Sequence, residues 1–330
     1  MKGCASILCV LLGFTSAQAS PKHVAYHELR YLENFASPKW SPRGSSLALK
    51  GREGIYVFDA AKPDVPPRLV VTGPWSGIDW SPDTEWLLVS AGSPSEPFYD
   101  RIDIEAVPLG KGRRCTIYFG ADRFGPMWAS DGYIYAWDQS PVYGLERYML
   151  PPPPEYSGRR PGPIAPMTYL VWAVNTRGQS RPTSFRCGLR PRDGALVNWD
   201  STGADNVFPR GSDAHGTRFL VTLFGLPTRD RDQIIDADGH LVARVGTDQA
   251  EWTTLSGDGN WLAGHHEIDQ GDNVAGGMLY VGDAKGTWLT SVVTPGAAIN
   301  PLFAREGLYV CFEDPVSGGL HVGELSIDDR

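Results

Sequence analysis

The densest group of side chains able to bind a metal ion lies toward the C-terminal end of the sequence. His265, His266 and Glu267 are consecutive, and Asp269 and Asp272 follow closely. Histidine nitrogens bind zinc and other transition metals, whereas carboxylates also bind harder ions. Consecutive side chains of a strand point to opposite faces, so both histidines would not easily reach one ion. We therefore interpret the segment as an exposed polar loop, with His265, His266 and Glu267 as the candidate metal ligands.

A second acidic motif, Asp236-Ala237-Asp238-Gly239, resembles the start of a calcium-binding loop. It lacks the further acidic ligands and the terminal glutamate that complete an EF-hand loop. Tight turns favour the same residues, because Asp caps the nearby backbone and Gly accepts a positive φ. The motif therefore predicts a hairpin turn.

Sequence signatures of covalent and nucleotide chemistry are missing. The chain has no Gly-x-Ser-x-Gly motif of the kind that presents the nucleophile of many serine hydrolases. It also has no phosphate-binding glycine loop and no dinucleotide-binding fingerprint. We therefore expect no catalytic residue set and no bound cofactor.

The charge balance bears on the class of partner. The chain has 38 acidic and 30 basic residues, a formal net charge of −8. Such a balance argues against nucleic acid or an anionic membrane surface as the main partner. We expect a protein or a small molecule instead.

The first nineteen residues have the pattern of a secretory signal peptide. Lys2 supplies a positive start, the apolar run Ile7–Phe14 follows, and the segment ends in Ala17-Gln18-Ala19. This order of charge, apolar core and Ala-x-Ala site is typical of an exported precursor. The run is also far shorter than the ~20 residues that span a bilayer. We expect cleavage near Ala19, export to a periplasm or the medium, and no membrane-spanning segment.

Three cysteines remain after such processing, namely Cys115, Cys187 and Cys311. None belongs to a Cys-x-x-Cys pair, which disfavours thiol-redox and zinc roles. A disulfide between Cys115 and Cys187 and three separate buried thiols are both compatible with the sequence.

A repeat organises the rest of the chain. Its clearest copies begin Trp40-Ser41-Pro42, Trp80-Ser81-Pro82-Asp83 and Trp128-Ala129-Ser130-Asp131-Gly132, each followed by an aliphatic or aromatic strand. Degenerate copies carry Ser212, Leu255 or Phe303 at the Trp position. Each unit also has a second β-rich stretch such as Ile55–Asp59. Six copies about 40 to 50 residues apart predict an all-β, six-bladed β-propeller over residues 20–330.

One interval, from Gly132 to Gly216, is about twice as long as the others. It contains residues 143–167, which include four consecutive prolines, Pro151–Pro154. Prolines in such a run cannot lie inside a sheet, so we interpret 143–167 as a loop insertion. A weak extra copy, Pro191–Val197, keeps seven blades as a minor alternative.

The Trp-Ser-Pro-Asp-Gly motif, with the later Ile-Tyr-x-x-Asp stretch, resembles the β-propeller repeat of the TolB class. The resemblance covers nearly all of residues 20–330 and implies a six-bladed ring. It does not extend to the separate N-terminal domain of TolB, for which the residues before Trp40 leave no room.

The connections that follow the second strand of each unit vary most and should share one face of the ring. Loops held by a rigid scaffold concentrate binding residues, and Tyr and Arg dominate binding energies. The tentative binding residues are Tyr99, Arg101, Arg147, Tyr148, Arg229, Arg231 and His266. We predict a non-enzymatic binding or scaffold protein. The alternative is a metal-dependent propeller enzyme acting on a small molecule or an acidic sugar.

The last unit is one strand short of four, because the chain ends soon after Leu320–Leu325. An open sheet edge would leave unpaired backbone groups. We therefore predict that His23–Leu29 forms the outermost strand of the last unit, beside Leu320–Leu325.

Overall fold

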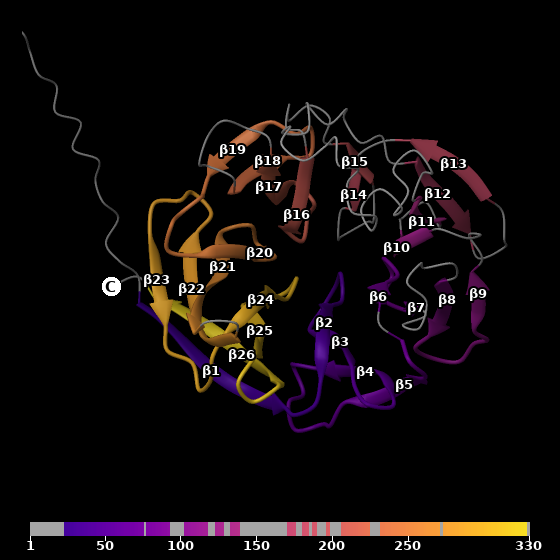
Figure 1. Ribbon diagram of the computed structural model, residues 1–330, viewed down its shortest axis with the longest axis horizontal. Helices are drawn as coiled ribbons and strands as arrows, with labels where there is room; N and C mark the ends of the chain where they lie inside the picture. The colour runs from indigo at the N-terminus through magenta and orange to yellow at the C-terminus, as the bar shows by residue number, and fades with distance from the viewer. Residues whose placement is uncertain are drawn as a thin grey trace, which may run out of the picture.

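The computed structural model describes residues 23–75, 77–92, 102–117, 123–128, 133–138, 170–175, 180–184, 187–189, 196–198, 206–224, 232–270 and 273–328. Every regular element in this part of the chain is a β-strand. These strands form six four-stranded antiparallel sheets and one two-stranded sheet. The sheets are arranged in a ring around a central axis (Figure 1). The fold is therefore an all-β propeller.

Three four-stranded sheets come from the first part of the chain, and each is ordered along the sequence. The first contains β2 (Ala36–Trp40), β3 (Ser46–Lys50), β4 (Gly54–Asp59) and β5 (Arg68–Thr72). The second contains β6 (Gly77–Trp80), β7 (Trp86–Gly92), β8 (Ile102–Pro108) and β9 (Cys115–Ile117). The third contains β10 (Arg123–Trp128), β11 (Tyr133–Asp138), β12 (Leu170–Asn175) and β13 (Ser180–Ser184).

The rest of the chain completes the ring. A two-stranded sheet of β14 (Cys187–Leu189) and β15 (Leu196–Asn198) comes first. The next sheet contains β16 (Asn206–Ser212), β17 (Arg218–Phe224), β18 (Asp232–Asp236) and β19 (Leu241–Arg244). It is followed by β20 (Glu251–Leu255), β21 (Trp261–Gln270), β22 (Asn273–Asp283) and β23 (Leu289–Val292). The closing sheet contains β24 (Ile299–Phe303), β25 (Tyr309–Asp314), β26 (Gly319–Asp328) and β1 (His23–Leu32).

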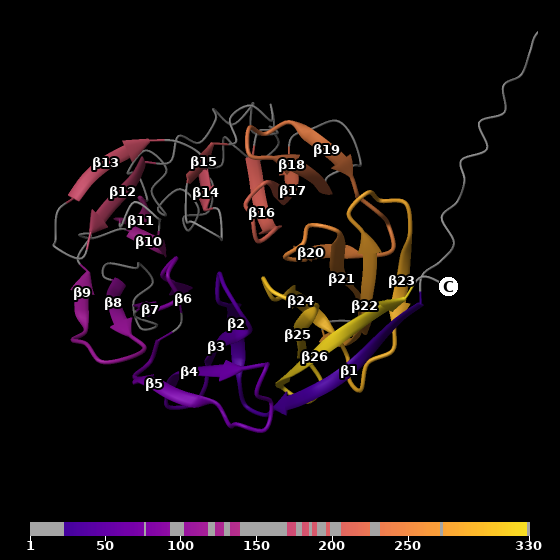
Figure 2. The same cartoon turned by 180° about the vertical axis from the view of Figure 1, so that it is seen from behind.

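The ring closes as the sequence predicts. β1 pairs antiparallel with β26 from His23 opposite Asp328 to Leu32 opposite Leu320. The sheet order β1-β26-β25-β24 makes β1 its outermost strand. Figures 1 and 2 show the N-terminal strand lying along the C-terminal one at the rim. The prediction for residues 23–29 is therefore confirmed, and the strand continues three residues further.

The antiparallel order gives the ring two different faces. In each four-stranded sheet, the first and third strands end at one face, which we call the turn face. The second and fourth strands end, and the first strand begins, at the other face, which we call the connection face. The repeat motif therefore occupies the turn face.

Side-chain hydrogen bonds explain why the repeat forms these turns. Ser81 Oγ donates to the Asp83 carboxylate and accepts from the Trp86 amide at 2.9 Å. Ser256 makes the same pair of bonds with Asp258 and with the Trp261 amide. A serine that caps both sides of the turn fixes where the next strand begins.

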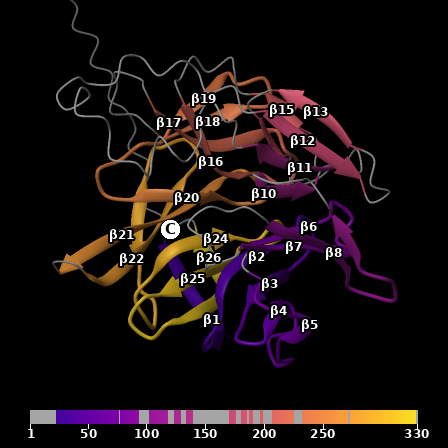
Figure 3. The ribbon, with the colours of Figure 1, turned by 45° about the vertical axis from the view of Figure 1, so that its right-hand side comes forward.

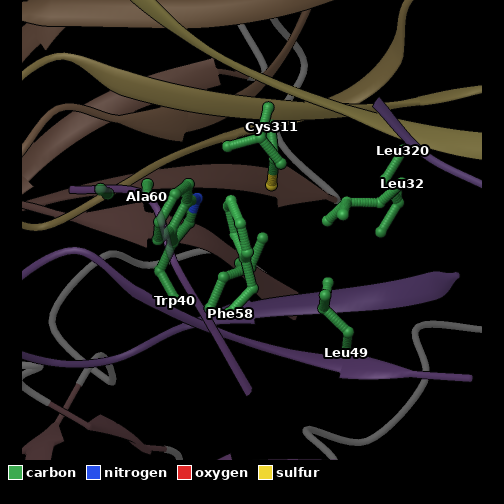
Figure 4. Close-up of a cluster of buried hydrophobic side chains, with 10 residues drawn as sticks. Leu32, Trp40, Leu49, Phe58, Ala60, Cys311 and Leu320 are labelled. Atoms are coloured by element: carbon green, nitrogen blue, oxygen red, sulfur yellow. The ribbon is translucent and has the colours of Figure 1, made fainter. Parts of the chain in front are cut away.

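The repeat tryptophans join neighbouring sheets. Trp80 Nε1 donates to the Lys39 carbonyl at 2.9 Å, and Trp40 Nε1 donates to the Leu302 carbonyl at 2.9 Å. Each indole therefore links its own inner strand to the inner strand of the preceding sheet. Figure 4 shows Trp40 packed with Phe58 and Cys311 in the core between the first sheet and the closing sheet. This core ties the closing sheet to the start of the ring.

Thr84 occupies the position where other copies of the turn carry glycine. Its φ is 65°, whereas Gly44 and Gly259 adopt 72° at the matching positions. A β-branched residue is strained in this left-handed region by about 1–2 kcal/mol. We expect Thr84→Gly to raise the free energy of unfolding by about 1 kcal/mol, measured by chemical denaturation. An equal or lower stability would contradict this assignment of strain.

The structure corrects the polar loop that the sequence predicts from His265 onward. This segment is instead the outer part of a long β-hairpin, in which β21 and β22 pair as far as Gln270 opposite Asn273. Figure 3 shows the hairpin extending beyond the neighbouring sheet. The polar residues and glycines of this segment suggested a loop, but the outer part of a β-hairpin can have the same composition.

The structure also decides one alternative for the cysteines. Cys115 and Cys311 are free thiols, so the Cys115–Cys187 disulfide is wrong. Cys115 lies at the rim of the second sheet in β9, whereas Cys187 lies in the separate β14–β15 sheet. Cys311 is buried, and burial raises the pKa of its thiol above the ordinary value. Among the described residues, no helical segment has the length and hydropathy needed to traverse a bilayer.

Candidate functional site

Of the side chains predicted to bind a partner, His266 is the one within the described part of the chain. The others lie outside the described residues, and they are Tyr99, Arg101, Arg147, Tyr148, Arg229 and Arg231. The insertion 143–167 also falls outside them, between β11 and β12. The described part of the candidate site is therefore the connection face around His266.

The two histidines of the candidate metal group lie on different sides of β21. His265 is 2% exposed, whereas His266 is exposed. His266 is paired with Met278 on β22, and His265 is paired with both Glu251 and Leu279. The opposite burial of adjacent histidines follows from the alternation of side chains along a strand. The strand therefore does not bring the two imidazoles together around one ion.

Within the described residues, one group of three side chains could hold a metal ion. Asp236, Asp238 and His240 offer ligand atoms within 4.8 Å of one another. The Asp236 carboxylate already accepts the amides of Asp238 and His240 at 2.9 and 2.8 Å. The His240 hydrogen bond is the main reason that the pKa of Asp236 lies below its ordinary value. Gly239 adopts φ 85° between β18 and β19, so the motif is the hairpin turn that the sequence predicts.

A polar cluster lies inside the closing sheet. His321 Nδ1 is 2.7 Å from Glu28 Oε1, and its Nε2 is 3.6 Å from Asp314 Oδ2. The side chains of His321 and Asp314 are 8% and 7% exposed. The His321 ring stacks on Phe312 at 5.1 Å between centroids and lies 4.8 Å from the Tyr31 ring. β1, β25 and β26 are thereby joined by side chains as well as by the backbone ladder.

The connection from β23 to β24 seals this cluster. A Cβ placed on Gly296 would be 2.6 Å from Asp314 Oδ2 and 2.9 Å from His321 Nε2. A side chain at position 296 would therefore have to displace the ends of the two side chains over which the backbone passes. Burial alone would raise the pKa of Asp314, but hydrogen bonds from Ser317 and Val316 and the nearby His321 hold it below its ordinary value.

Four large apolar side chains are exposed toward the connection face in this part of the ring. Val293 is 92% exposed, Val316 71%, Met278 39% and Tyr31 37%. We call these four residues, together with His266, the closure patch. Three other large apolar residues of the described chain are exposed, namely Val65, Leu241 and Val242. These three lie at the β4–β5 turn and at the start of β19, toward the turn face.

Backbone pairing and hydrogen bonds connect the segments that carry the closure patch. On β22, Met278 is followed by Leu279. Leu279 is paired with Val292 at the end of β23, and Val293 is the next residue. The connection then crosses toward the axis, where the Ala298 amide donates to the Gly277 carbonyl at 3.0 Å. Val316 lies in the turn that links Asp314 to Gly319, and a Cβ on Gly319 would contact the Tyr31 ring. The members of the patch therefore come from neighbouring strands and connections at the connection face.

A second polar cluster lies where the β16–β19 and β20–β23 sheets meet. Arg210 donates to Thr222 Oγ1 at 3.0 Å and to Glu251 Oε1 at 2.8 Å. Thr222 Oγ1 in turn donates to Asp232 Oδ1 at 2.6 Å. Burial raises the pKa of Asp232 above its ordinary value. These groups pair with one another, so the cluster joins two sheets through bonds that it already makes.

Comparisons with known proteins support the fold. No protein-family model matches the chain, and no curated protein matches it. Among solved structures, oligogalacturonate lyase from Vibrio parahaemolyticus matches with a TM-score of 0.55 and 14% identity. The match covers 92% of this chain and 97% of that one. At this identity the likeness concerns the propeller fold alone.

TolB structures are also among the matches. TolB from Acinetobacter baumannii has a TM-score of 0.42 and 15% identity, over 92% of this chain and 64% of that one. Putative TolB from Agrobacterium tumefaciens has a TM-score of 0.41 and 14% identity, over 90% and 91%. This chain therefore spans less than two thirds of the length of the Acinetobacter protein.

Several residues of this region were not singled out from the sequence. Glu28 and His321 are nearly three hundred positions apart, and neither belongs to a recognisable motif. The predicted pairing of 23–29 with 320–325 contains the signal, because it places both residues on adjacent strands. Val293 and Val316 carry no such signal, since their exposure depends on where the connections leave the sheets.

Proposed function

We propose that this chain is an exported, non-enzymatic binding or scaffold propeller that holds a protein partner on its connection face. The observation that carries the proposal is the closure patch. Monomeric proteins rarely expose contiguous apolar patches larger than about a few hundred Å², and larger patches mark interaction sites. Val293 and Val316 are the two most exposed large apolar residues of the described chain, and both belong to the patch.

Capture of the partner tests the proposal. The purified protein, immobilised through a C-terminal tag, is incubated with the envelope fraction and the medium of the native host. We expect a partner that is retained at comparable molar amount and is released by competing soluble protein. Failure to retain any protein at physiological salt would contradict a binding role.

The proposed export has its own test. The pattern Lys2 to Ala19 motivates it, and N-terminal sequencing of protein from the native host should begin at Ser20 or Pro21. Protein recovered from the cytosol with Met1 intact would contradict export.

The second candidate is a metal-dependent enzyme acting on a small molecule or an acidic sugar. The oligogalacturonate lyase match, over nearly the full length of both chains, favours it at the level of fold. Fold does not fix function, so its support is weaker than that of an observed surface. Metal analysis of protein purified without chelators separates the two. One tightly bound ion per chain, lost together with a lyase activity, would favour the enzyme.

The sequence predicts six blades, with seven as a minor alternative. We propose the seven-position ring, with six four-stranded positions and one centred on β14–β15. Support comes from the seven sheets of the described residues and from the place of β14–β15 between β13 and β16 (Figure 2). The weak repeat copy Pro191–Val197 leads into β15. Deleting residues 187–198 should then abolish cooperative unfolding, followed by circular dichroism. A six-position ring would tolerate the deletion with little change in the midpoint, because surface loops cost little stability.

A further inference from the structure

Three segments that carry or border the closure patch lack basic residues. Residues 31–35, 293–299 and 313–321 contain no lysine or arginine. They contain exposed Glu33 at the β1–β2 connection, half-buried Glu313 and buried Asp314. A partner that buries the apolar side chains must therefore approach the carboxylates of Glu33 and Glu313. Complementary charge steers such an encounter, whereas like charge opposes it.

The backbone beneath the patch is held in place by packing. Tyr31 lies against His321, and Gly296 fits closely over His321 and Asp314. The Val316 amide donates to the Asp314 carboxylate at 2.9 Å. The segments carrying Tyr31, Val293 and Val316 are thus anchored to one buried cluster. A surface ordered before binding loses less conformational entropy when its partner arrives.

The arrangement of the patch suggests the shape of its partner. Its side chains come from β1, the β21–β22 hairpin, the β23–β24 connection and the β25–β26 turn, in succession along the edges of two sheets. Small ligands are usually buried in a concave site, whereas an extended peptide contacts separate side chains in turn. The arrangement therefore fits a peptide segment better than a small molecule.

We infer that the closure patch binds an extended segment of another protein, whose apolar side chains are flanked by lysine or arginine. This inference rests on the proposed binding function and adds the chemistry of the partner. The apolar side chains of the segment cover Val293 and Val316, and its cations lie near Glu33 and Glu313. Raising the salt concentration weakens binding because the charges of exposed Glu33 and half-buried Glu313 are screened.

A displayed library of random peptides is the probe. It is selected on the full chain and counter-selected on the double variant Val293→Ser, Val316→Ser. The selected peptides should combine apolar residues with Lys or Arg. Synthetic versions should bind the double variant about tenfold more weakly or worse, as measured by fluorescence anisotropy. The single variant Glu33→Lys should weaken binding about threefold and reduce its salt dependence.

Val65→Ser is the matched control, because Val65 is 56% exposed on the turn face. It should leave peptide binding unchanged, and all variants should keep the unfolding midpoint of the full chain. No enriched peptide, an acidic consensus, or equal affinity for the double variant would overturn the inference. If the double variant still retains the captured native partner, the binding function stands and this placement of it fails.

Discussion

Removal of residues 23–32 should lower the unfolding midpoint by about 10 °C or more and make the protein prone to aggregate. The deletion takes away all of β1, including buried Leu32, half-buried Val24 and Tyr26, and the Glu28–His321 contact. It also exposes the backbone edge of β26, which then invites pairing with other chains. Differential scanning calorimetry and light scattering measure the two effects.

The deletion has two controls. A synthetic peptide of residues 23–32, added in trans, should restore much of the lost midpoint if β1 acts by pairing with β26. Tyr26→Phe in the full chain should be neutral or stabilising, because the buried Tyr26 hydroxyl has no hydrogen-bond partner. A truncated protein that melts like the full chain would show that ring closure does not depend on β1.

Gly257→Ala should destabilise the protein by about 3 kcal/mol, the upper end for forced overpacking. A Cβ at Gly257 would lie 1.9 Å from the Arg305 carbonyl oxygen, and backbone atoms cannot move aside as a flexible side chain can. Arg305 also donates to the Ser212 carbonyl, and burial lowers the pKa of its guanidinium to about 10. Turns from three successive sheets therefore meet at this point on the turn face.

Gly257→Pro would restore the Ser-Pro-Asp-Gly repeat and should nevertheless destabilise the chain, for the same steric reason. Gly110→Ala is the matched control, because a Cβ there has nothing within 4 Å. Chemical denaturation should place that control within about 0.5 kcal/mol of the original chain. If Gly257→Pro were as stable as the original, the packing of Arg305 against this turn would be wrong.

Local rules explain which parts of the fold were predictable. The Trp-Ser-Pro-Asp motif combines turn chemistry with an indole that needs a neighbouring sheet, so its recurrence predicts both the strands and the ring. The missing fourth strand of the last unit likewise predicts the role of β1. The pairing of β1 with β26 could be anticipated because unpaired backbone edges of a sheet are unfavourable.

Other features depend on contacts that a linear pattern does not contain. The segment after His265 was expected to be a loop, because an exposed hairpin and a polar loop share their residue types. Arg305 packs against Gly257 only because two degenerate copies of the turn meet in space. The closure patch forms only because several connections leave their sheets close together, which the sequence does not show. Six of the seven loop residues chosen from the sequence lie outside the described chain.

Hydrogen–deuterium exchange of the protein with and without its captured partner tests the central claim most directly. Slower exchange is predicted in residues 31–35, 293–298 and 313–318, with little change in the turns at 41–45, 81–85 and 256–260. Protection confined to those turns, or spread evenly over both faces, would contradict binding on the connection face.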